Sequence, residues 1–326
     1  MNDSRWSVNP PYDESFMPHA QNDPTSLFVR RSWRNHRERA SRQGGVDFLH
    51  QEIAARLLDR LSQIARSFHA VLDLGAHSGA LSRALATRSE VEQIVALEPS
   101  MGFLTKSAGS LVAADPEFLP FRDHSFDLVI SSLALHWVAD LPGTLVQLRR
   151  VLKPDGLLLA AMPGGATLAE LRTALIEAEL AEEGGASPRV SPTVDLADAA
   201  ALLQRTGFAM PVADADVITV TYPSILALMS DLRGMGETNA LSARRRTMLR
   251  RATLVRAAAI YQERFGLADG RIPATFEIFF LAGWAPDAGQ PKPLRPGVIQ
   301  QRLALGAARG TVGPPLGADN PPPRTP

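Results

Sequence analysis

The sequence predicts an α/β protein built around a parallel sheet, and three observations carry this prediction. Short apolar runs alternate with helical patterns between Ala70 and Met162, at the spacing of βαβ units. A glycine turn follows the first run, in the stretch H-A-V-L-D-L-G-A-H-S-G that begins at His69. Acidic or small polar residues end the successive runs, where ligands of parallel sheets bind.

Composition narrows the classes of function. The chain has 326 residues, 45% of them hydrophobic, which is enough to bury a full core. Its 34 basic residues balance 34 acidic ones, which argues against nucleic acid as the main partner. Since there is no cysteine, disulfides and thiolate metal sites are excluded, and a reducing compartment is expected. No apolar run reaches membrane-spanning length.

The first part of the chain is expected to be a disordered tail (1–26) followed by N-terminal helices (27–68). One helix carries six arginines around Trp33, namely Arg30, Arg31, Arg34, Arg37, Arg39 and Arg42. Two interpretations stay open for it: a solvated helix lying against the domain, or a basic lid over an acidic ligand or partner. The second helix is predicted from Phe48 to Phe68, with one apolar face.

The sheet domain is predicted at 69–285. Five buried strands are expected at Ala70–Leu74, Gln93–Leu97, Leu111–Ala114, Phe126–Ser131 and Leu157–Met162. Helices are expected at Leu81–Ala86, Met101–Ser107 and Leu141–Leu152, and a proline turn at 153–156.

Two further strands complete the predicted domain, at Val217–Tyr222 and Thr275–Trp284. A helical insertion (224–270) separates them and favours a substrate lid. Its arginines, Arg244, Arg245, Arg246, Arg250 and Arg251, would form either a solvated face or a basic surface. The proline- and glycine-rich segment 286–326 is expected to be a disordered tail.

The strand ends indicate a nucleoside-like ligand. Glu98 could accept the ribose hydroxyls, and Asp115 could accept the amino group of adenine. Asp73 stands two residues before Gly75, where it would repel a pyrophosphate but help to hold a cationic ligand. S-adenosylmethionine therefore fits the charges better than a dinucleotide does. Gly79 and Ser131 complete the predicted cofactor-binding set, and any one of these residues alone could equally be an ordinary turn or capping residue.

Several motifs carry a resemblance to a known family. V-L-D-L-G-A-H-S-G, A-L-E-P-S, S-F-D-L-V-I-S-S-L-A-L-H-W-V and L-K-P-D-G resemble the motifs of class I S-adenosylmethionine-dependent methyltransferases. D-L-R-G-M-G-E-T-N and P-A-T-F-E-I-F-F-L-A-G-W extend the resemblance to the methyltransferase-like assembly factors of respiratory complex I. The malonyl-carrier methyltransferases of the biotin pathway are similar more distantly.

The resemblance implies a Rossmann-like seven-stranded methyltransferase sheet, mostly parallel with an antiparallel last strand, helices on both faces and a helical insertion between strands six and seven. It implies S-adenosyl-L-methionine as cofactor and a protein substrate. Members of the family are implicated in hydroxylating an arginine of the small iron–sulfur subunit of complex I. A cytoplasmic, matrix-equivalent location, with peripheral association at the inner membrane, would follow.

Candidate site residues lie beyond the fourth strand and in the insertion. His136 is the candidate base, although a lone histidine is often structural. Trp137 would be a wall of the site or part of the core. Gly234 and Gly236 could simply break a helix, whereas the resemblance implies that they and Glu237 shape a loop against the substrate.

One departure from the family pattern is His77, which stands where the superfamily turn usually carries a glycine. The sequence shows no clustered two-histidine, one-carboxylate set for iron, and a metal site is not predicted. Three functions therefore stay open: a methyltransferase, an arginine hydroxylase and a non-catalytic assembly chaperone.

Overall fold

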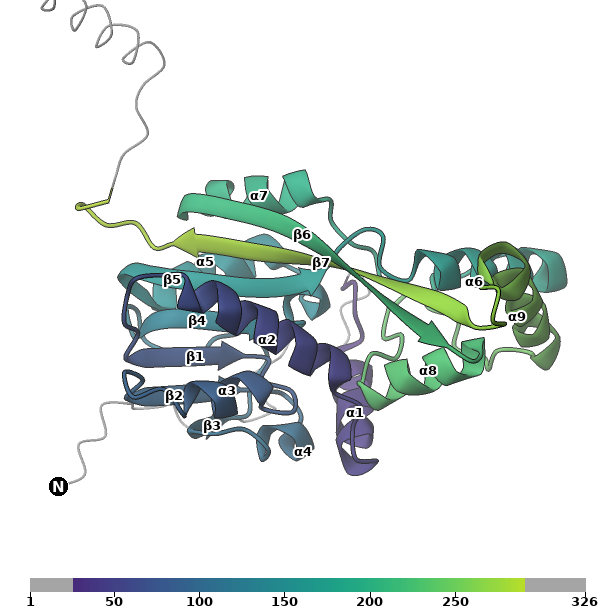
Figure 1. Ribbon diagram of the computed structural model, residues 1–326, viewed down its shortest axis with the longest axis horizontal. Helices are drawn as coiled ribbons and strands as arrows, with labels where there is room; N and C mark the ends of the chain where they lie inside the picture. Colours follow the sequence, from purple (N-terminus) through teal and green to yellow (C-terminus); the bar gives the residue numbers. More distant parts are fainter. Residues whose placement is uncertain (1–25, 291–326) are drawn as a thin grey trace, which may run out of the picture. The chain divides into compact units, whose positions relative to one another are not determined.

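Seven strands form a sheet in the computed structural model, which describes residues 26–290 (Figure 1). Their order is β3-β2-β1-β4-β5-β7-β6. The bounds are β1 Ala70–Leu74, β2 Gln93–Leu97, β3 Ser110–Val112, β4 Phe126–Ser132, β5 Leu152–Pro163, β6 Ala209–Tyr222 and β7 Ile272–Trp284. The order reverses between β1 and β4, which places a crevice at the carboxyl ends of these strands.

Strand directions confirm the predicted fold class. β1 pairs in parallel with β2 and β4, and β4 pairs in parallel with β5. β7 runs antiparallel to both β5 and β6. The register sets Leu74 beside Leu97 on one side and Ser131 on the other, so three strands end together at one edge.

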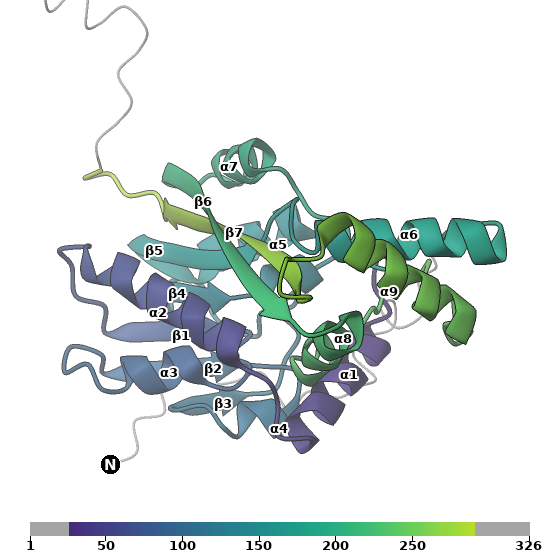
Figure 2. The same cartoon turned by 45° about the vertical axis from the view of Figure 1, so that its right-hand side comes forward.

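Helices cover both faces of the sheet (Figure 2). On one face, α2 (Phe48–Ser62) and α3 (Ala80–Leu85) pack on alternate strand residues such as Val71 and Ile130. On the other face, α5 (Leu141–Val151) and α7 (Leu196–Arg205) pack on residues such as Leu72. The strands therefore read as continuous apolar runs, because both of their faces are buried.

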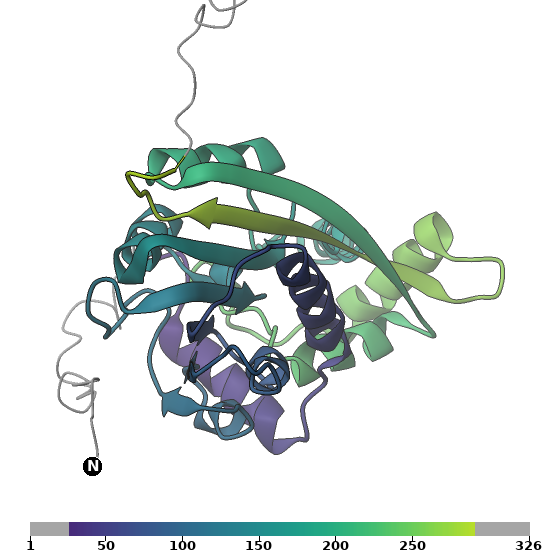
Figure 3. The same ribbon diagram turned by 60° about the vertical axis from the view of Figure 1, so that its left-hand side comes forward.

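The remaining helices lie around the carboxyl edge and the far ends of β6 and β7 (Figure 3). They are α1 (Arg30–Arg42), α4 (Met101–Leu104), the short 3₁₀ helix η2 (Leu135–Trp137), α6 (Ala169–Glu183), α8 (Ile225–Gly234) and α9 (Arg251–Phe265). α1 contacts α4 and α8, so the start of the chain meets the insertion at this edge. The insertion between β6 and β7 is helical, as predicted.

Several elements differ from the sequence prediction, among them α2, which ends at Ser62 rather than Phe68. β6 begins at Ala209 rather than Val217, because an edge strand with exposed residues shows no continuous apolar run. The segment 153–156 lies inside β5, with Asp155 at φ 60, rather than in a free turn. α6 and α7 fall in a stretch where no helix had been predicted.

Both chain ends lie largely outside the described residues. The predicted tails 1–26 and 286–326 therefore stay predictions, apart from the few residues at their inner borders. Within residues 26–290, none of the helices combines the length and hydrophobicity that crossing a bilayer requires.

Candidate functional site at the carboxyl edge of the sheet

The acids predicted to bind a cofactor do meet at the carboxyl edge, but each already has partners within the chain. Glu98, which directly follows β2, is completely buried. Its two oxygens accept hydrogen bonds from Nε and Nη2 of Arg37, at 2.9 and 2.7 Å. They also accept the backbone N–H groups of His77 and Ser100, both at 3.1 Å. The geometry is a bidentate arginine–carboxylate pair braced by two amides.

Asp115 has a similar partner. Arg30 donates from Nε to Oδ2 at 2.8 Å and from Nη2 to Oδ1, and Nη1 of the same arginine donates to the carbonyl of Trp137. The backbone N–H of Glu117 donates to Oδ1 at 3.1 Å. Both Arg30 and Asp115 are buried. The loop after β3 is thus tied to α1 and to η2.

Helix α1 delivers these two arginines together with Trp33, at spacings of three and four residues that share one face of a helix. Trp33 is buried, with the Arg30 guanidinium 4.1 Å and the Arg37 guanidinium 5.6 Å from its ring centre. Of the two interpretations of this helix, a solvated face is therefore wrong for Arg30 and Arg37. The helix does cover acids, but the acids belong to the chain itself.

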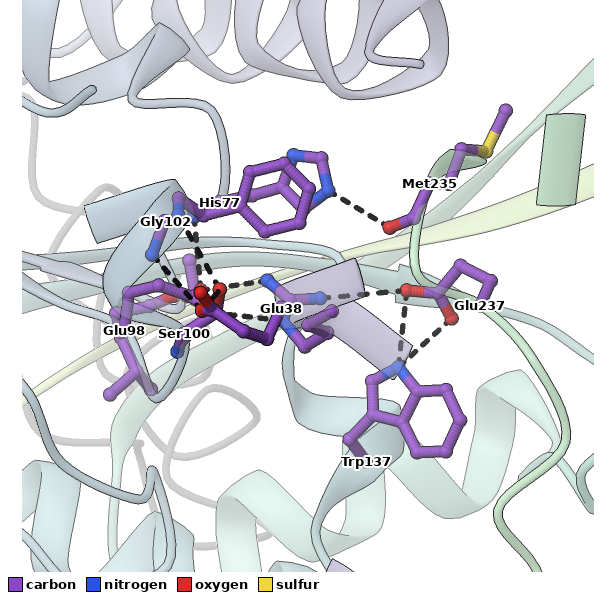
Figure 4. A network of polar contacts seen from close by, with 12 residues as sticks. Glu38, His77, Glu98, Ser100, Gly102, Trp137, Met235 and Glu237 are labelled. Atoms are coloured by element: carbon purple, nitrogen blue, oxygen red, sulfur yellow. Dashed lines mark hydrogen bonds and ion pairs between the residues drawn. The ribbon is translucent and has the colours of Figure 1, made fainter. Parts of the chain in front are cut away.

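The single acidic residue of α1, Glu38, reaches the same region. Glu38 Oε2 accepts the Ser100 hydroxyl at 2.8 Å and the Gly102 N–H at 3.1 Å (Figure 4). These groups lie at the N-terminal end of α4, where donors point outward. The start of α4 is therefore satisfied by α1.

His77 is buried in the turn between β1 and α3, with φ at 48°. Its ring lies between those of His50, at 3.7 Å, and Phe103, at 3.9 Å. Nε2 donates to the carbonyl of Met235 at 2.9 Å (Figure 4). Burial, together with the neighbouring His50 and Arg37, holds the pKa of His77 well below its usual value. The ring is therefore neutral and occupies the space that a glycine would leave open.

The other predicted cofactor residues also contact other parts of the chain. Asp73 Oδ2 accepts the Ser82 N–H at 3.0 Å, while Oδ1 has no hydrogen-bond partner within residues 26–290. Burial raises the pKa of Asp73 to about 7. Ser131 donates to the carbonyl of Leu74 at 2.9 Å. Gly79 precedes α3 at φ 75°, and a Cβ on Gly75 would lie 2.2 Å from that of Ala134.

A pocket opens next to this region, beyond the ends of β4 and β5. It is a cavity of about 120 Å³, mostly lined by apolar side chains. Its walls come from the start of α2, the β4–η2 segment, residues 189–193, the end of α8 and β7. Its polar lining includes His50, His136, Trp137, Glu237 and Asn239. Asp73, Glu98 and Asp115 are not among the described residues that line this pocket.

Glu237 is the acid of this pocket, whose lining also includes Arg189, paired with Glu179. Oε2 accepts Nε2–H of His136 at 2.9 Å. Both oxygens of Glu237 also accept the indole N–H of Trp137, Oε2 at 2.9 Å and Oε1 at 3.1 Å (Figure 4). Burial disfavours the carboxylate, but His136, Arg37 and His50 outweigh it and keep the pKa of Glu237 below its usual value. Glu237 is therefore ionised at neutral pH. Its side chain is 18% exposed, whereas that of Glu98 is 0% exposed.

The predicted glycines next to Glu237 serve packing. Gly236 has φ at 82°, and a Cβ there would lie 3.1 Å from the Cα of Arg37. The carbonyl of Gly234 accepts the N–H of Val46 at 2.9 Å. Both glycines let the end of α8 approach the N-terminal helices closely, and so hold Glu237 over the pocket.

Two of the strand-end acids, Glu98 and Asp115, do not fit S-adenosylmethionine in this arrangement. A carboxylate offers about four lone-pair sites. On Glu98 they meet the four hydrogen bonds described above, so ribose hydroxyls find no acceptor. Arg30 likewise donates to both carboxylate oxygens of Asp115.

Sequence reasoning missed three residues of this region. Arg30 and Arg37 were grouped with four other arginines, although their spacing around Trp33 is the signal that distinguishes them. His50 lies in the predicted second helix and was not singled out. It is buried, neither ring nitrogen has a partner among the described residues, and burial lowers its pKa to about 4.

Comparisons with known proteins agree with the fold. A model of the methyltransferase domain matches residues 72–160. The arginine-hydroxylase NDUFAF5 of Danio rerio, a mitochondrial protein, is 43% identical over 256 residues, covering 77% of this chain and 79% of the relative. That of Homo sapiens is 39% identical over 290 residues, covering 86% and 84%.

Two more distant matches share the same core. The malonyl-acyl-carrier-protein O-methyltransferase of Xylella fastidiosa is 35% identical over 247 residues, covering 73% of this chain and 81% of the relative. The crystal structure of a Bacillus halodurans protein assigned as a methyltransferase superposes with a TM-score of 0.50 at 17% identity, covering 72% of this chain and 99% of that one. At that identity the superposition supports the fold alone.

Proposed function

The chain belongs to the arginine-hydroxylase NDUFAF5 family of methyltransferase-fold proteins, and from this premise we propose that it hydroxylates an arginine side chain of a protein during complex I assembly. The proposed substrate is the small iron–sulfur subunit of complex I. The observation that carries the proposal is Glu237, an ionised acid exposed to an otherwise largely apolar pocket.

An arginine side chain suits this pocket in both of its parts. Its methylene stem matches apolar walls such as Leu133, Leu168 and Met235. Its guanidinium matches the carboxylate of Glu237 and can stack on an aromatic ring, as Trp137 offers. Arg37 hydrogen-bonds to Glu98 and reaches Glu237 only at 3.7 Å, so the direct hydrogen-bond partners of Glu237 are His136 and Trp137, and its carboxylate favours a further cation.

The reaction needs a positioned C–H bond. With molecular oxygen as the oxidant, one oxygen atom enters the C–H bond as a hydroxyl group and the other leaves as water, with two electrons and two protons taken from an external reductant. The role proposed for Glu237 and His136 is to hold the guanidinium, so that the methylene stem lies at a fixed position.

Methyl transfer is the alternative chemistry for this fold, and the distant O-methyltransferase relatives favour it. It requires S-adenosylmethionine close to the acceptor. Binding of this cofactor is disfavoured because Glu98 and Asp115 are already hydrogen-bonded to Arg37 and Arg30. A chaperone without chemistry is the other alternative. It requires a protein-binding surface but no reactive pocket.

The proposed place of action is the matrix-equivalent compartment, the cytoplasm of a bacterium, with peripheral association at the inner membrane. The two NDUFAF5 relatives named above are mitochondrial proteins, which supports a place of action where complex I is assembled. The exposed arginines of the insertion, including Arg246, Arg250 and Arg251, would face anionic lipid headgroups.

Mass spectrometry of the small iron–sulfur subunit tests the proposal. In a strain that carries Glu237→Gln, the arginine peptide should lose its single-oxygen mass increment, because the neutral amide no longer holds the guanidinium. Glu263→Gln, an exposed site on α9, is the matched control and should keep the increment. An unchanged increment in the Glu237→Gln strain would contradict the proposal. A subunit that carries no single-oxygen increment even in the wild-type strain, while complex I still depends on this protein for assembly, would favour the chaperone.

A further inference from the structure

We infer that the strand-end cleft of this chain is closed by its own side chains and takes no S-adenosylmethionine, so that α1 is a fixed part of the core rather than a movable cover. The inference concerns the region of Glu98, Asp115 and His77. It does not depend on the proposed reaction, which is placed in the neighbouring pocket.

The first argument is that the two acids that an adenosine would need, Glu98 and Asp115, are each held by a buried arginine. Arg37 is 1% exposed and holds Glu98, while Arg30 is 5% exposed and holds Asp115. Each pair is bidentate, which is the strongest geometry available to these groups. A nucleoside hydroxyl or amino group could reach the acids only after a buried arginine had left without a partner.

The second argument is the turn after β1, which normally approaches a ligand through its backbone N–H groups. Here Gly75 and Ala76 donate to the carbonyl of Leu97, at 2.8 and 3.0 Å, and His77 donates to Glu98. The side of Gly75 that lacks a Cβ faces Ala134. The glycine is therefore explained by packing within the chain.

The third argument is His77 itself, because it stays in the turn wherever α1 lies. Its ring is stacked between His50 of α2 and Phe103 of α4 and is bonded to Met235. A swing of α1 alone would leave the ring in place, so a movable helix would not open the cleft.

The fourth argument is the packing that fixes α1. Phe28, Trp33 and Trp137 form a buried cluster with Ala240 and Leu241 of the insertion. Phe28 and Leu241 also form a β-bridge, and the Val29 N–H donates to the carbonyl of Ala240 at 2.8 Å. The helix and the residues before it are thus held by Trp137 of η2 and by Ala240 and Leu241 of the insertion.

Calorimetric titration of the purified full-length protein with S-adenosylmethionine tests the inference, with S-adenosylhomocysteine as a second probe. The folded wild-type protein should give no saturable heat with either compound at millimolar concentration. Saturable binding that is lost in Glu98→Gln would overturn the inference.

A double variant identifies the cause of the closure. His77→Gly with Arg37→Ala frees the turn and the oxygens of Glu98, so the folded variant should gain saturable binding of S-adenosylmethionine. Arg31→Ala, an exposed site on the same helix, is the control and should gain none. A folded double variant that stays without binding would overturn the role given to His77 and Arg37, while the wild-type titration decides the rest even if the variant does not fold.

The proposed hydroxylation and the closed cleft are tested independently of each other. Binding of S-adenosylmethionine by the wild-type protein would leave the single-oxygen increment of the subunit to be measured on its own. Loss of the proposed hydroxylation would not change whether the cleft is closed.

Discussion

Glu98 and Glu237 have the same side chain but different surroundings. Glu98 is fully enclosed and has an arginine as its direct partner, so its charge is neutralised inside the protein. Glu237 borders the pocket, and the nearest nitrogen of Arg37 lies 3.7 Å away. Residue type alone therefore does not decide which acid is available to a ligand, because the partners do.

Asp73 allows a test of the buried electrostatics through pH. Burial, with a contribution from Glu98, raises its pKa to about 7, against an ordinary value of 3.8. Between these values the folded state keeps a proton that the unfolded state has lost, so the free energy of unfolding falls as pH rises. A shift of about three units corresponds to at most about 4 kcal/mol.

The expected result is a difference in slope. Urea unfolding between pH 4 and pH 7 should show wild-type stability falling relative to Asp73→Asn, and the difference should be flat above the folded pKa. Parallel curves for the two proteins would show that Asp73 does not carry this proton.

Helix α1 is the element that closes the carboxyl edge of the sheet, where a ligand would otherwise bind. Its face with Arg30, Trp33 and Arg37 points at the sheet, while Arg31 and Arg39 are exposed. The helix lacks a side-chain cap at its N-terminus, so tertiary contacts rather than local signals hold it in place.

A double-mutant cycle measures this contact. Arg37→Met leaves Glu98 buried without its cation and should lower the free energy of unfolding by about 3–5 kcal/mol. Glu98→Gln in the same chain removes the uncompensated charge, so the double variant should be more stable than the sum of the single losses predicts. Arg31→Met should change stability by less than about 0.5 kcal/mol. Additive losses would show that the two side chains are not coupled.

The molecule as a whole brings together segments far apart in the sequence. Arg37 and Glu98 are 61 residues apart, and His136 and Glu237 are 101 apart. The N-terminal helices, the sheet edge and the insertion therefore depend on one another, and we expect them to unfold together.

Coincident unfolding transitions check this expectation. Trp33 and Trp137 are both buried where α1 meets the sheet edge, so a Trp6→Phe, Trp284→Phe variant would report on that contact by fluorescence. Its fluorescence and its far-ultraviolet circular dichroism should change at the same urea concentration. An earlier fluorescence change would mean that α1 detaches while the sheet stays folded.

The sheet was predictable because its signal is local. Each buried strand is a short apolar run bounded by turn residues, so the range predicted for β1 agrees with the structure. The start of β6 could not be predicted, because the sequence pattern of this edge strand mixes exposed and half-buried residues. Among the predicted site residues, His136, Trp137 and Glu237 meet in one pocket, whereas Glu98 and Asp115 meet arginines instead.

The sequence by itself determined the methyltransferase fold, the family and the acids at the strand ends, since these follow from local patterns and motifs. Only the tertiary structure decided what those acids contact. Six arginines surround Trp33 in the sequence, and which of them are buried depends on the angle at which α1 crosses the sheet edge. A buried carboxylate must have a partner, and the chain supplies it from a helix that local patterns could not place.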